Sequence, residues 1–361
     1  MKTVALGVSG GIDSTMTALI LQEQGYKVIG LHMTKWDESS GIISQDKRGC
    51  FGPGEKDATS SARLACERLG IPFYSIDLRD EFEHEVLTYF RNEFMGGRTP
   101  NPCVICNRRI KFGRLITKAR DMGLQFDYFA TGHYAINEYN DRLQRWQLSQ
   151  ARDKSKDQSY FLGFLSQAQL SEIIFPLGAM LKSEIKAYAE ARGYAYLVRR
   201  KESQDFLEAE DASPLFAKCK PEPGDFVDEQ GKILGQHQGL PYYTIGQRRH
   251  LGLAGFPQPM HVLKIDSETN RIVLGTADRL MQASLIAASI NWVSIPPTSQ
   301  QLSCHAKIRN AHVPAACKAQ LQEDGTMKVV FDTAQSAITP GQLLALYDGN
   351  LLLAAGIILT A

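Results

Sequence analysis

The chain has 361 residues and is 43% hydrophobic, enough for two or three domains with buried cores. Its 40 basic and 39 acidic side chains give a formal charge of +1, so the total charge does not indicate a polyanionic partner. Seven cysteines and no apolar leader after Met1 predict a reducing, cytoplasmic location, where clustered cysteines bind metals or catalyse more often than they form disulfides. Because no apolar run approaches the ~20 residues that span a bilayer, we expect no membrane association.

The first part of the chain alternates short apolar strands with amphipathic helices. The expected strands are 4–8, 28–33, 73–77 and 128–131, and the expected helices are 14–24, 57–69, 81–95 and 112–122. This order predicts a parallel sheet covered by helices on both faces, with ligands at the carboxyl ends of the strands. Further helical segments at 167–174 and 182–192 extend the expected first domain over residues 1–206.

Two β-rich regions are expected after the first domain. In residues 207–279, short strands at 226–227, 262–265 and 271–274 with glycine-rich turns predict a small central domain. In residues 280–361 the strand pattern predicts a closed or nearly closed β-barrel. Its expected strands are 289–293, 303–308, 316–320, 327–331, 343–347 and 354–359. The predicted fold class is therefore α/β, a parallel-sheet domain followed by two smaller β domains.

A glycine turn, Ser9-Gly10-Gly11-Ile12-Asp13-Ser14, connects the first strand to the first helix. The glycines let the backbone approach an anion, the serines offer hydroxyls, and the first N–H groups of the helix favour negative charge. The Walker spacing requires a lysine after the glycines, and this turn has Asp13 and no lysine. It resembles the pyrophosphate loop (PP-loop) of ATP pyrophosphatases, with an ordinary strand-to-helix turn as the alternative.

Residues 96–107 contain two glycines, two prolines and the pair Cys103-x-x-Cys106. Prolines and glycines at this density predict a shaped loop rather than a helix. The two thiols could be a redox pair, half of a metal site, a nucleophile with its partner, or two ordinary buried thiols. We expect the basic residues in 108–111 to lower the pKa of Cys106.

Further motifs follow one another along nearly the whole chain. The segments are 9–14, 98–102, 106–107 with 110–112, 130–135, 156–161, 235–239, 243–248 and 339–342. Together they resemble the successive signatures of the tRNA-specific 2-thiouridylase family. The combination is much more specific than the glycine turn or the cysteine pair alone.

The resemblance implies a reaction and its participants. Enzymes of that family bind ATP in the PP-loop, adenylate the C2 oxygen of the wobble uridine of tRNA, and replace that oxygen with sulfur from a cysteine persulfide. It implies ATP and Mg²⁺ as cofactors, tRNA and a sulfur-donor protein as partners, and no role for DNA. Cys106 matches the catalytic nucleophile, and Cys103, a second catalytic candidate, stands where the family has an aspartate.

The resemblance also implies binding residues. The expected ATP-binding residues are Leu6, Gly7, Val8, Ser9, Gly10, Gly11, Ile12, Asp13, Ser14, Met33 and Gly132. The expected tRNA-binding residues are Asn101, Pro102, Cys103, His133, Lys156, Asp157, Gln158, Arg309 and Gln342. Taken alone, Met33 could be a core residue and His133 a structural histidine.

The match breaks at the family's second cysteine, where this chain has Leu207. Leucine can neither carry sulfur nor close a disulfide. One hypothesis is that Cys50, Cys103 and Cys106 hold a [4Fe–4S] cluster whose fourth iron binds the sulfur to be transferred. The competing hypothesis makes Cys103 the thiol that resolves a persulfide on Cys106, and leaves Cys50 as a small loop residue.

Three other functions share part of this pattern. A PP-loop ligase or amidating enzyme acting on a small molecule would need residues 9–14 but not the cysteine pair. A catalytically retired tRNA-binding relative would explain Leu207 but not the intact glycine turn. Thiolation of another tRNA position through an iron–sulfur cluster also stays open.

Overall fold

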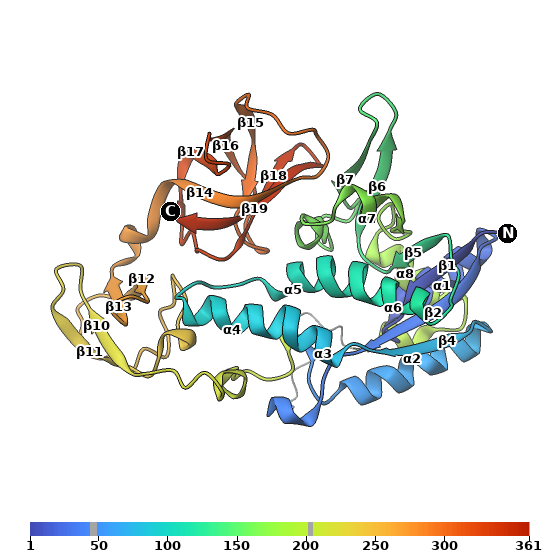
Figure 1. Cartoon of the computed structure of the whole chain (residues 1–361), viewed down its shortest axis with the longest axis horizontal. Coiled ribbons are helices and arrows are strands. Elements are labelled where there is room, and N and C mark those ends of the chain that lie inside the picture. Colours follow the sequence, from blue (N-terminus) through green and yellow to red (C-terminus); the bar gives the residue numbers. More distant parts are fainter. Residues whose placement is uncertain (44–48, 201–204, 361) are drawn as a thin grey trace.

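The computed structural model describes residues 1–43, 49–200 and 205–360. Its N-terminal part contains a five-stranded sheet with the order β4-β2-β1-β5-β8, in which every neighbouring pair is parallel. The strands are β1 (Thr3–Gly7), β2 (Lys27–Thr34), β4 (Phe73–Asp77), β5 (Tyr128–Thr131) and β8 (Ile173–Ile174). The predicted parallel sheet is confirmed, and β1, which leads into the glycine turn, is its central strand (Figure 1).

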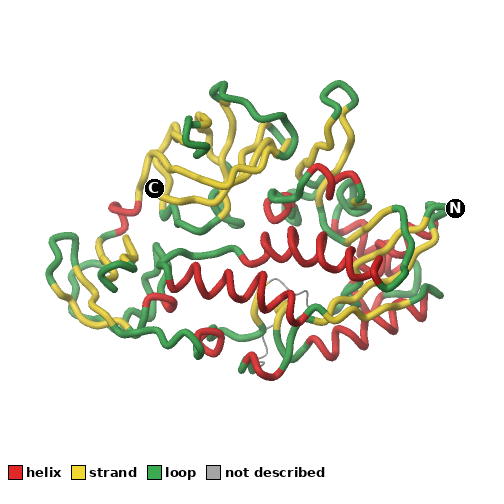
Figure 2. Tube along the Cα trace, in the orientation of Figure 1, coloured by secondary structure: helices red, strands yellow, loops and turns green. Residues whose placement is uncertain are grey.

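Helices cover both faces of this sheet because alternate side chains of its strands point to opposite sides. On one face, Val4 and Leu6 pack with residues of α1 (Ile12–Glu23) and α2 (Glu55–Leu69). On the other face, Ala5 belongs to the core formed with two longer helical segments. These are α3 (Arg79–Phe82), η2 (Glu83–Leu87) and α4 (Thr88–Met95), then α5 (Pro102–Ile105), η3 (Cys106–Arg114) and α6 (Leu115–Asp121). Figure 2 shows the two segments running side by side.

The second of these helical segments begins earlier than expected. We predicted a helix over 112–122 and a loop over 96–107, but the helix already starts at Pro102. The Asn101 side chain accepts a hydrogen bond from the backbone N–H of Val104 (3.4 Å), so Asn101-Pro102 is a helix start. An N-cap asparagine followed by proline at the first helical position is a favoured combination, and counting prolines only as loop signals was wrong.

A β-hairpin follows β5, in a segment where no strands were expected. It consists of β6 (Ala135–Asn140) and β7 (Arg145–Gln150). The predicted helix over 167–174 is divided into α7 (Gln167–Ser171) and β8, after which come α8 (Lys182–Ala191) and α9 (Ala195–Val198). A short parallel pair joins β3 (Gly49–Phe51) to β9 (Asp205–Leu207).

Two β domains complete the chain. The central sheet has the order β11-β10-β13-β12, with β10 (Gly224–Val227), β11 (Ile233–His237), β12 (His261–Asp266) and β13 (Arg271–Gly275). The C-terminal strands are β14 (Met281–Trp292), β15 (Leu302–Lys307), β16 (Ala315–Leu321), β17 (Met327–Ser336), β18 (Leu343–Asp348) and β19 (Leu351–Thr360). Pairing of β14 with β19 closes these six strands into the predicted barrel.

Short helical turns link these elements. The barrel is also paired with the β-hairpin of the N-terminal part. The turns are η1 (Glu38–Ser40), η4 (Ser159–Leu162), η5 (Ser213–Phe216), η6 (Leu240–Tyr242) and η7 (Ala277–Leu280). The hairpin strand β7 pairs with β19 through Ser149 and Leu351, which attaches the barrel to the hairpin. Figure 1 shows the barrel above α5. In the described part of the chain, no helix is both long enough and apolar enough to cross a membrane.

Gly178, in the turn before α8, packs closely against Ala135 at the start of β6. A Cβ on Gly178 would lie 1.9 Å from the carbonyl oxygen of Ala135, a backbone atom that cannot turn away. We therefore expect Gly178→Ala to lower the free energy of unfolding of the N-terminal domain by about 3 kcal/mol, measured by urea denaturation.

The matched control is Gly193→Ala, just after α8, where a Cβ meets nothing within 4 Å but φ is +83°. This change should cost only about 1 kcal/mol, from the left-handed backbone. Equal losses for the two variants would contradict the close approach of Gly178 to Ala135.

Candidate functional site

The glycine turn between β1 and α1 is shaped by close contact with α2. Gly10 has φ +73°, and a Cβ there would lie 2.6 Å from backbone atoms of Ser61 and Ala62, so no other residue fits. The backbone N–H of Ser9 donates to the Ser14 hydroxyl (3.2 Å). The residue before the helix is a glycine and has no side chain to cap the first N–H groups of α1, which are then available to an anion.

The residues expected on the adenine side lie at the same edge of the sheet. In the parallel sheet, Gly7 at the end of β1 is paired with Leu31 of β2 on one side and with Thr131 of β5 on the other. Met33 and Gly132 therefore lie just beyond the end of β1, one on each side. A Cβ on Gly132 would approach the backbone of the turn to 2.9 Å, so this glycine also allows a close contact.

Three of the other expected nucleotide contacts have buried side chains. Leu6, Val8 and Ile12 are 0%, 7% and 5% exposed and belong to the core, so mainly their backbone groups could contact a ligand. The carbonyl oxygen of Val8 is already hydrogen-bonded to Nδ1 of His32 (2.8 Å).

Asp13, the acid of the turn, is held by two residues from other elements. Its Oδ1 and Oδ2 accept hydrogen bonds from Nζ of Lys182 at 2.7 and 2.8 Å, and Oδ1 also accepts one from the Tyr134 hydroxyl at 2.8 Å. The Lys182 side chain is 7% exposed and that of Asp13 is 28% exposed. The turn that lacks a lysine in the sequence therefore has one beside it in space.

Cys103 and Cys106 lie in the first turns of the helix that starts at Pro102. Cys106 is 7% exposed and Cys103 is partly buried, whereas Cys50 on β3 is exposed. A separation of three residues places the Cys103 and Cys106 side chains on one face of the helix. The cysteine pair thus lies at the N-terminus of the helix that starts at Pro102, called the cysteine helix below, rather than within a loop.

Burial controls the protonation of these thiols. It raises the pKa of Cys106 to about 11, against the opposing charges of Lys111 and Lys35. Burial and the neighbouring thiols of Cys50 and Cys106 also raise the pKa of Cys103 far above its ordinary value. The expectation that the basic run lowers the pKa of Cys106 is therefore wrong in its net sign.

The physical reason is the direction in which the basic side chains point. Lys111 acts on Cys106 in the expected sense, but Arg108 and Arg109 are exposed to solvent, where charges are well screened. Loss of hydration by a buried thiolate outweighs the one nearby lysine.

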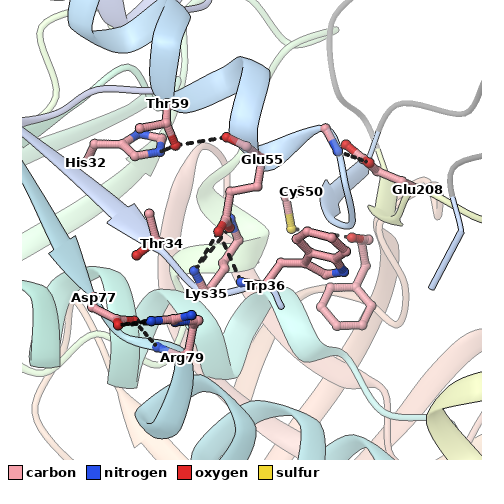
Figure 3. A network of polar contacts seen from close by, with 12 residues as sticks. His32, Thr34, Lys35, Trp36, Cys50, Glu55, Thr59, Asp77, Arg79 and Glu208 are labelled. Carbon is pink, nitrogen blue, oxygen red and sulfur yellow. Dashed lines mark hydrogen bonds and ion pairs between the residues drawn. The ribbon is translucent and has the colours of Figure 1, made fainter. Parts of the chain in front are cut away.

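A buried ion pair lies next to Cys50 (Figure 3). Nζ of Lys35 donates to Oε2 of Glu55 at 3.0 Å, and the two side chains are 9% and 7% exposed. Glu55 also accepts the backbone N–H groups of Lys35 and Trp36. The pair joins the end of β2 to the start of α2, and the charge of Lys35 acts on the thiols of both Cys50 and Cys106.

Leu207, in place of the expected second cysteine, lies beside the strand that carries Cys50. In the parallel pair β3–β9, Leu207 is opposite Phe51, and both are buried. The Cys50 thiol donates to the carbonyl oxygen of Phe206 (3.5 Å). A thiol is thus present on the neighbouring strand although position 207 has none.

The predicted three-thiolate metal site is not formed as a compact ligand set. Within residues 1–43, 49–200 and 205–360, no three His, Cys, Asp or Glu side chains lie in an arrangement that could hold a metal ion. Charge interactions connect Cys50, Cys103 and Cys106, so the three thiols share one neighbourhood.

Several residues expected to bind tRNA make contacts within the protein. Nε2 of Gln342 donates to the carbonyl oxygens of Thr99 and Pro100 at 2.9 and 3.1 Å. Asn101 is 8% exposed, and its side chain is hydrogen-bonded to Tyr160 as well as to the helix it caps. Gln342 and Asn101 are therefore brought together at the junction of the barrel and the cysteine helix.

The remaining expected tRNA contacts are more scattered. Nδ1 of His133 is 2.7 Å from the Thr131 hydroxyl, and burial with the charge of Lys111 lowers its pKa well below the ordinary value, so the ring is neutral at pH 7. Internal hydrogen bonds occupy Asp157, with the backbone of Ala151, and Gln158, with the backbone of Tyr134. Lys156 and Arg309 are partly buried, and Arg309 donates to the carbonyl oxygen of Ser336.

Sequence reasoning missed four charged residues around the turn and the thiols. They are Lys182, Arg200, Lys35 and Glu55. Arg200 donates to the carbonyl oxygen of Gly10 and to the Ser61 hydroxyl. The sequence correctly predicted that Lys182 begins a helix. A positive charge is unfavourable at a helix N-terminus, and this unusual position was the signal that could have identified Lys182. The ion pair of Lys35 with Glu55 joins residues 20 apart and left no comparable signal.

The raised pKa of Cys106 can be tested by alkylation. Since iodoacetamide reacts with the thiolate, the rate at Cys106 should rise about tenfold per pH unit from pH 7 to about 9.5 without a plateau. Peptide mass spectrometry after timed quenching measures this rate, and the exposed Cys50 should be labelled faster at pH 7. A plateau near pH 8 would show that the Cys106 thiolate is stabilised, not disfavoured.

Comparison with known proteins gives matches along the chain. A family model described as tRNA methyl transferase HUP domain matches residues 2–208, and one described as tRNA methyl transferase PRC-barrel domain matches residues 215–276. A third, described as aminomethyltransferase beta-barrel domain, matches residues 282–358.

Curated relatives match over nearly their whole length. The chain is 40% identical to the tRNA-specific 2-thiouridylase MnmA of Acetivibrio thermocellus, over 99% of both chains. It is 41% identical to that of Carboxydothermus hydrogenoformans, over 99% of this chain and 97% of the relative. It is also 41% identical to that of Magnetococcus marinus, over 98% of both. With the glycine turn, the cysteine helix and the barrel in one arrangement, this chain belongs to the tRNA-specific 2-thiouridylase family.

Proposed function

We propose that this protein is an ATP-dependent tRNA uridine 2-sulfurtransferase. It adenylates the C2 oxygen of the wobble uridine and replaces that oxygen with sulfur, which gives 2-thiouridine, AMP and pyrophosphate. The main support is that the cysteine helix lies near the edge of the sheet that carries the glycine turn, as the position of Lys35 indicates. Lys35 follows β2 at the carboxyl edge of the sheet, where the glycine turn also lies, and it is close enough to Cys106 for its charge to act on the thiol.

The residues around the glycine turn fit the first step. The uridine oxygen attacks the α-phosphorus of ATP, and the bond to the bridging oxygen breaks, so that pyrophosphate leaves with the electron pair. The open N-terminus of α1 and the Ser9 and Ser14 hydroxyls can bind the phosphates. The Asp13 carboxylate is an oxygen ligand of the kind that Mg²⁺ prefers, and a bound Mg²⁺ would neutralise phosphate charge.

For the second step we propose a persulfide on Cys106. Its terminal sulfur attacks C2 of the adenylated uridine, and AMP leaves with the electron pair. The Cys103 thiolate then attacks Sγ of Cys106, which forms the Cys103–Cys106 disulfide and leaves the sulfur on the base. A thiol reductant must restore the pair, as in other thiol–disulfide exchanges. Two cysteines three residues apart on a helix start are suitably placed for this step.

An iron–sulfur cluster is the alternative way to hold the sulfur. The three candidate ligands have the right donor chemistry. However, no compact three-ligand set is present among the described residues, so we derive no step through a cluster.

We also propose a persulfide-bearing donor protein as the partner that loads Cys106, and a cytoplasmic location. All seven cysteines are free thiols, which fits a reducing compartment. The donor thiol must reach a cysteine that is 7% exposed, so loading requires either a slender donor loop or a movement of the cysteine helix.

The function is tested by supplying ATP with and without unmodified tRNA. We expect pyrophosphate release that depends on tRNA and, with a sulfur source, 2-thiouridine in the nucleosides detected by mass spectrometry. Cys106→Ser should abolish 2-thiouridine but retain pyrophosphate release, because adenylation does not use the thiol. Pyrophosphate release without tRNA would indicate a small-molecule ligase, and its complete absence would indicate a binding protein.

The way in which sulfur is held is tested by two serine variants. The persulfide proposal predicts that Cys103→Ser reduces turnover at least 100-fold while Cys50→Ser leaves it within twofold. Anaerobic purification with iron and sulfide assays is the control. If Cys50→Ser is as damaging as Cys103→Ser and the wild type contains about four irons per chain, the cluster account is correct and the persulfide account is wrong.

A further inference from the structure

The glycine turn lacks the lysine with which Walker loops neutralise the β- and γ-phosphates. The leaving group of adenylation is pyrophosphate, whose charge rises as the bond to the α-phosphorus breaks, so a cation at that position would lower the barrier. Two cationic side chains of the described residues contact this turn: Lys182 through Asp13, and Arg200 through the carbonyl oxygen of Gly10.

Lys182 occupies a position that is unfavourable for structural reasons. It is the first residue of α8, where the helix dipole disfavours a positive charge. Its side chain is nevertheless drawn inward and is 7% exposed, although buried lysines are rare. The backbone N–H of the same residue is fixed by Oδ2 of Asp153 (2.9 Å), so the start of the helix is held in place independently of the ammonium group.

The contacts of the ammonium group direct it to the phosphate site. Nζ is 2.7 and 2.8 Å from the two carboxylate oxygens of Asp13, in the first turn of α1, and 5.7 Å from the centre of the Tyr134 ring. Replacing a buried ion pair with apolar side chains is often neutral or stabilising, so stability alone does not explain this pair. A function in which the ammonium meets the anion bound at the start of α1 explains both its burial and its position.

We propose that Lys182 is the phosphate-binding lysine of this enzyme, supplied by α8 in place of the absent Walker lysine. Asp13 holds the ammonium at the turn when no nucleotide is bound. When ATP binds, Lys182 transfers hydrogen bonding from Asp13 to oxygens of the β- and γ-phosphates and neutralises the departing pyrophosphate. This assignment rests on the proposed adenylation and names the residue that stabilises its leaving group.

The test compares Lys182→Met with Lys186→Met, an exposed lysine on the same helix. Calorimetry measures the binding of ATP, inorganic pyrophosphate and AMP to each variant. Lys182→Met should weaken ATP and pyrophosphate at least 10-fold and leave AMP, which has no β- or γ-phosphate, within about twofold. It should also slow tRNA-dependent pyrophosphate release about 100-fold. Lys186→Met should match the wild type in all four measurements.

A second variant protects the test against misfolding. Lys182→Met leaves Asp13 without its cation, whereas Lys182→Met combined with Asp13→Asn removes both charges and keeps the Tyr134 contact possible. Because Asp13 is itself the proposed Mg²⁺ ligand, the double variant is compared only for folding and AMP binding. Both should match Lys182→Met, which shows that an unpaired Asp13 charge does not cause the loss of pyrophosphate affinity in the single variant.

Two results would overturn the assignment. Equal losses of AMP and ATP affinity would show that Lys182 only supports the fold, and unchanged pyrophosphate affinity would show that it lies outside the phosphate site. The proposed function fails separately, if the wild type releases no pyrophosphate with tRNA. In that case a selective loss of pyrophosphate binding in Lys182→Met would still support Lys182 as a phosphate ligand.

Discussion

The parallel pairing of β1 with β2 and β5 is the constraint on which the site depends. In a parallel ladder the carboxyl ends of neighbouring strands meet at one edge, so the glycine turn, Met33 and Gly132 converge although they are distant in the chain. Lys35 continues from β2 at this edge and acts electrostatically on Cys106. The sheet therefore brings the glycine turn to the same edge as Lys35, whose charge acts on Cys106.

The barrel contributes to this arrangement by holding Thr99 and Pro100, the residues that precede the cysteine helix. The carbonyl oxygen of Pro340 accepts the backbone N–H of Thr99 (2.8 Å), and Gln342 binds the carbonyl oxygens of Thr99 and Pro100. Gly341 has φ +91°, and a Cβ there would lie 2.8 Å from the carbonyl oxygen of Thr99, so glycine is required for this contact. These contacts connect the barrel to the residues that directly precede the cysteine helix, whose N-cap is Asn101 and which carries Cys106.

Sequence patterns were most informative where the physics is local. The glycine turn and the strands 73–77 and 128–131 depend on short-range chemistry, and the structure places them as predicted. The start of the cysteine helix was also local, but proline was read only as a loop signal. Contacts such as that of Asp13 with Lys182 could not be predicted, because they join residues that only the folded topology brings together.

The burial of the thiols has a consequence for the proposed sulfur transfer, because it keeps Cys106 protonated in this structure. A thiol whose pKa is about 11 is almost entirely protonated at neutral pH, and a protonated thiol is a poor nucleophile. The adjacent lysines already act to lower this value, so the remaining barrier is loss of hydration, not lack of positive charge. A conformational change that admits the substrate or the donor would rehydrate the thiol and let Lys111 and Lys35 stabilise its thiolate.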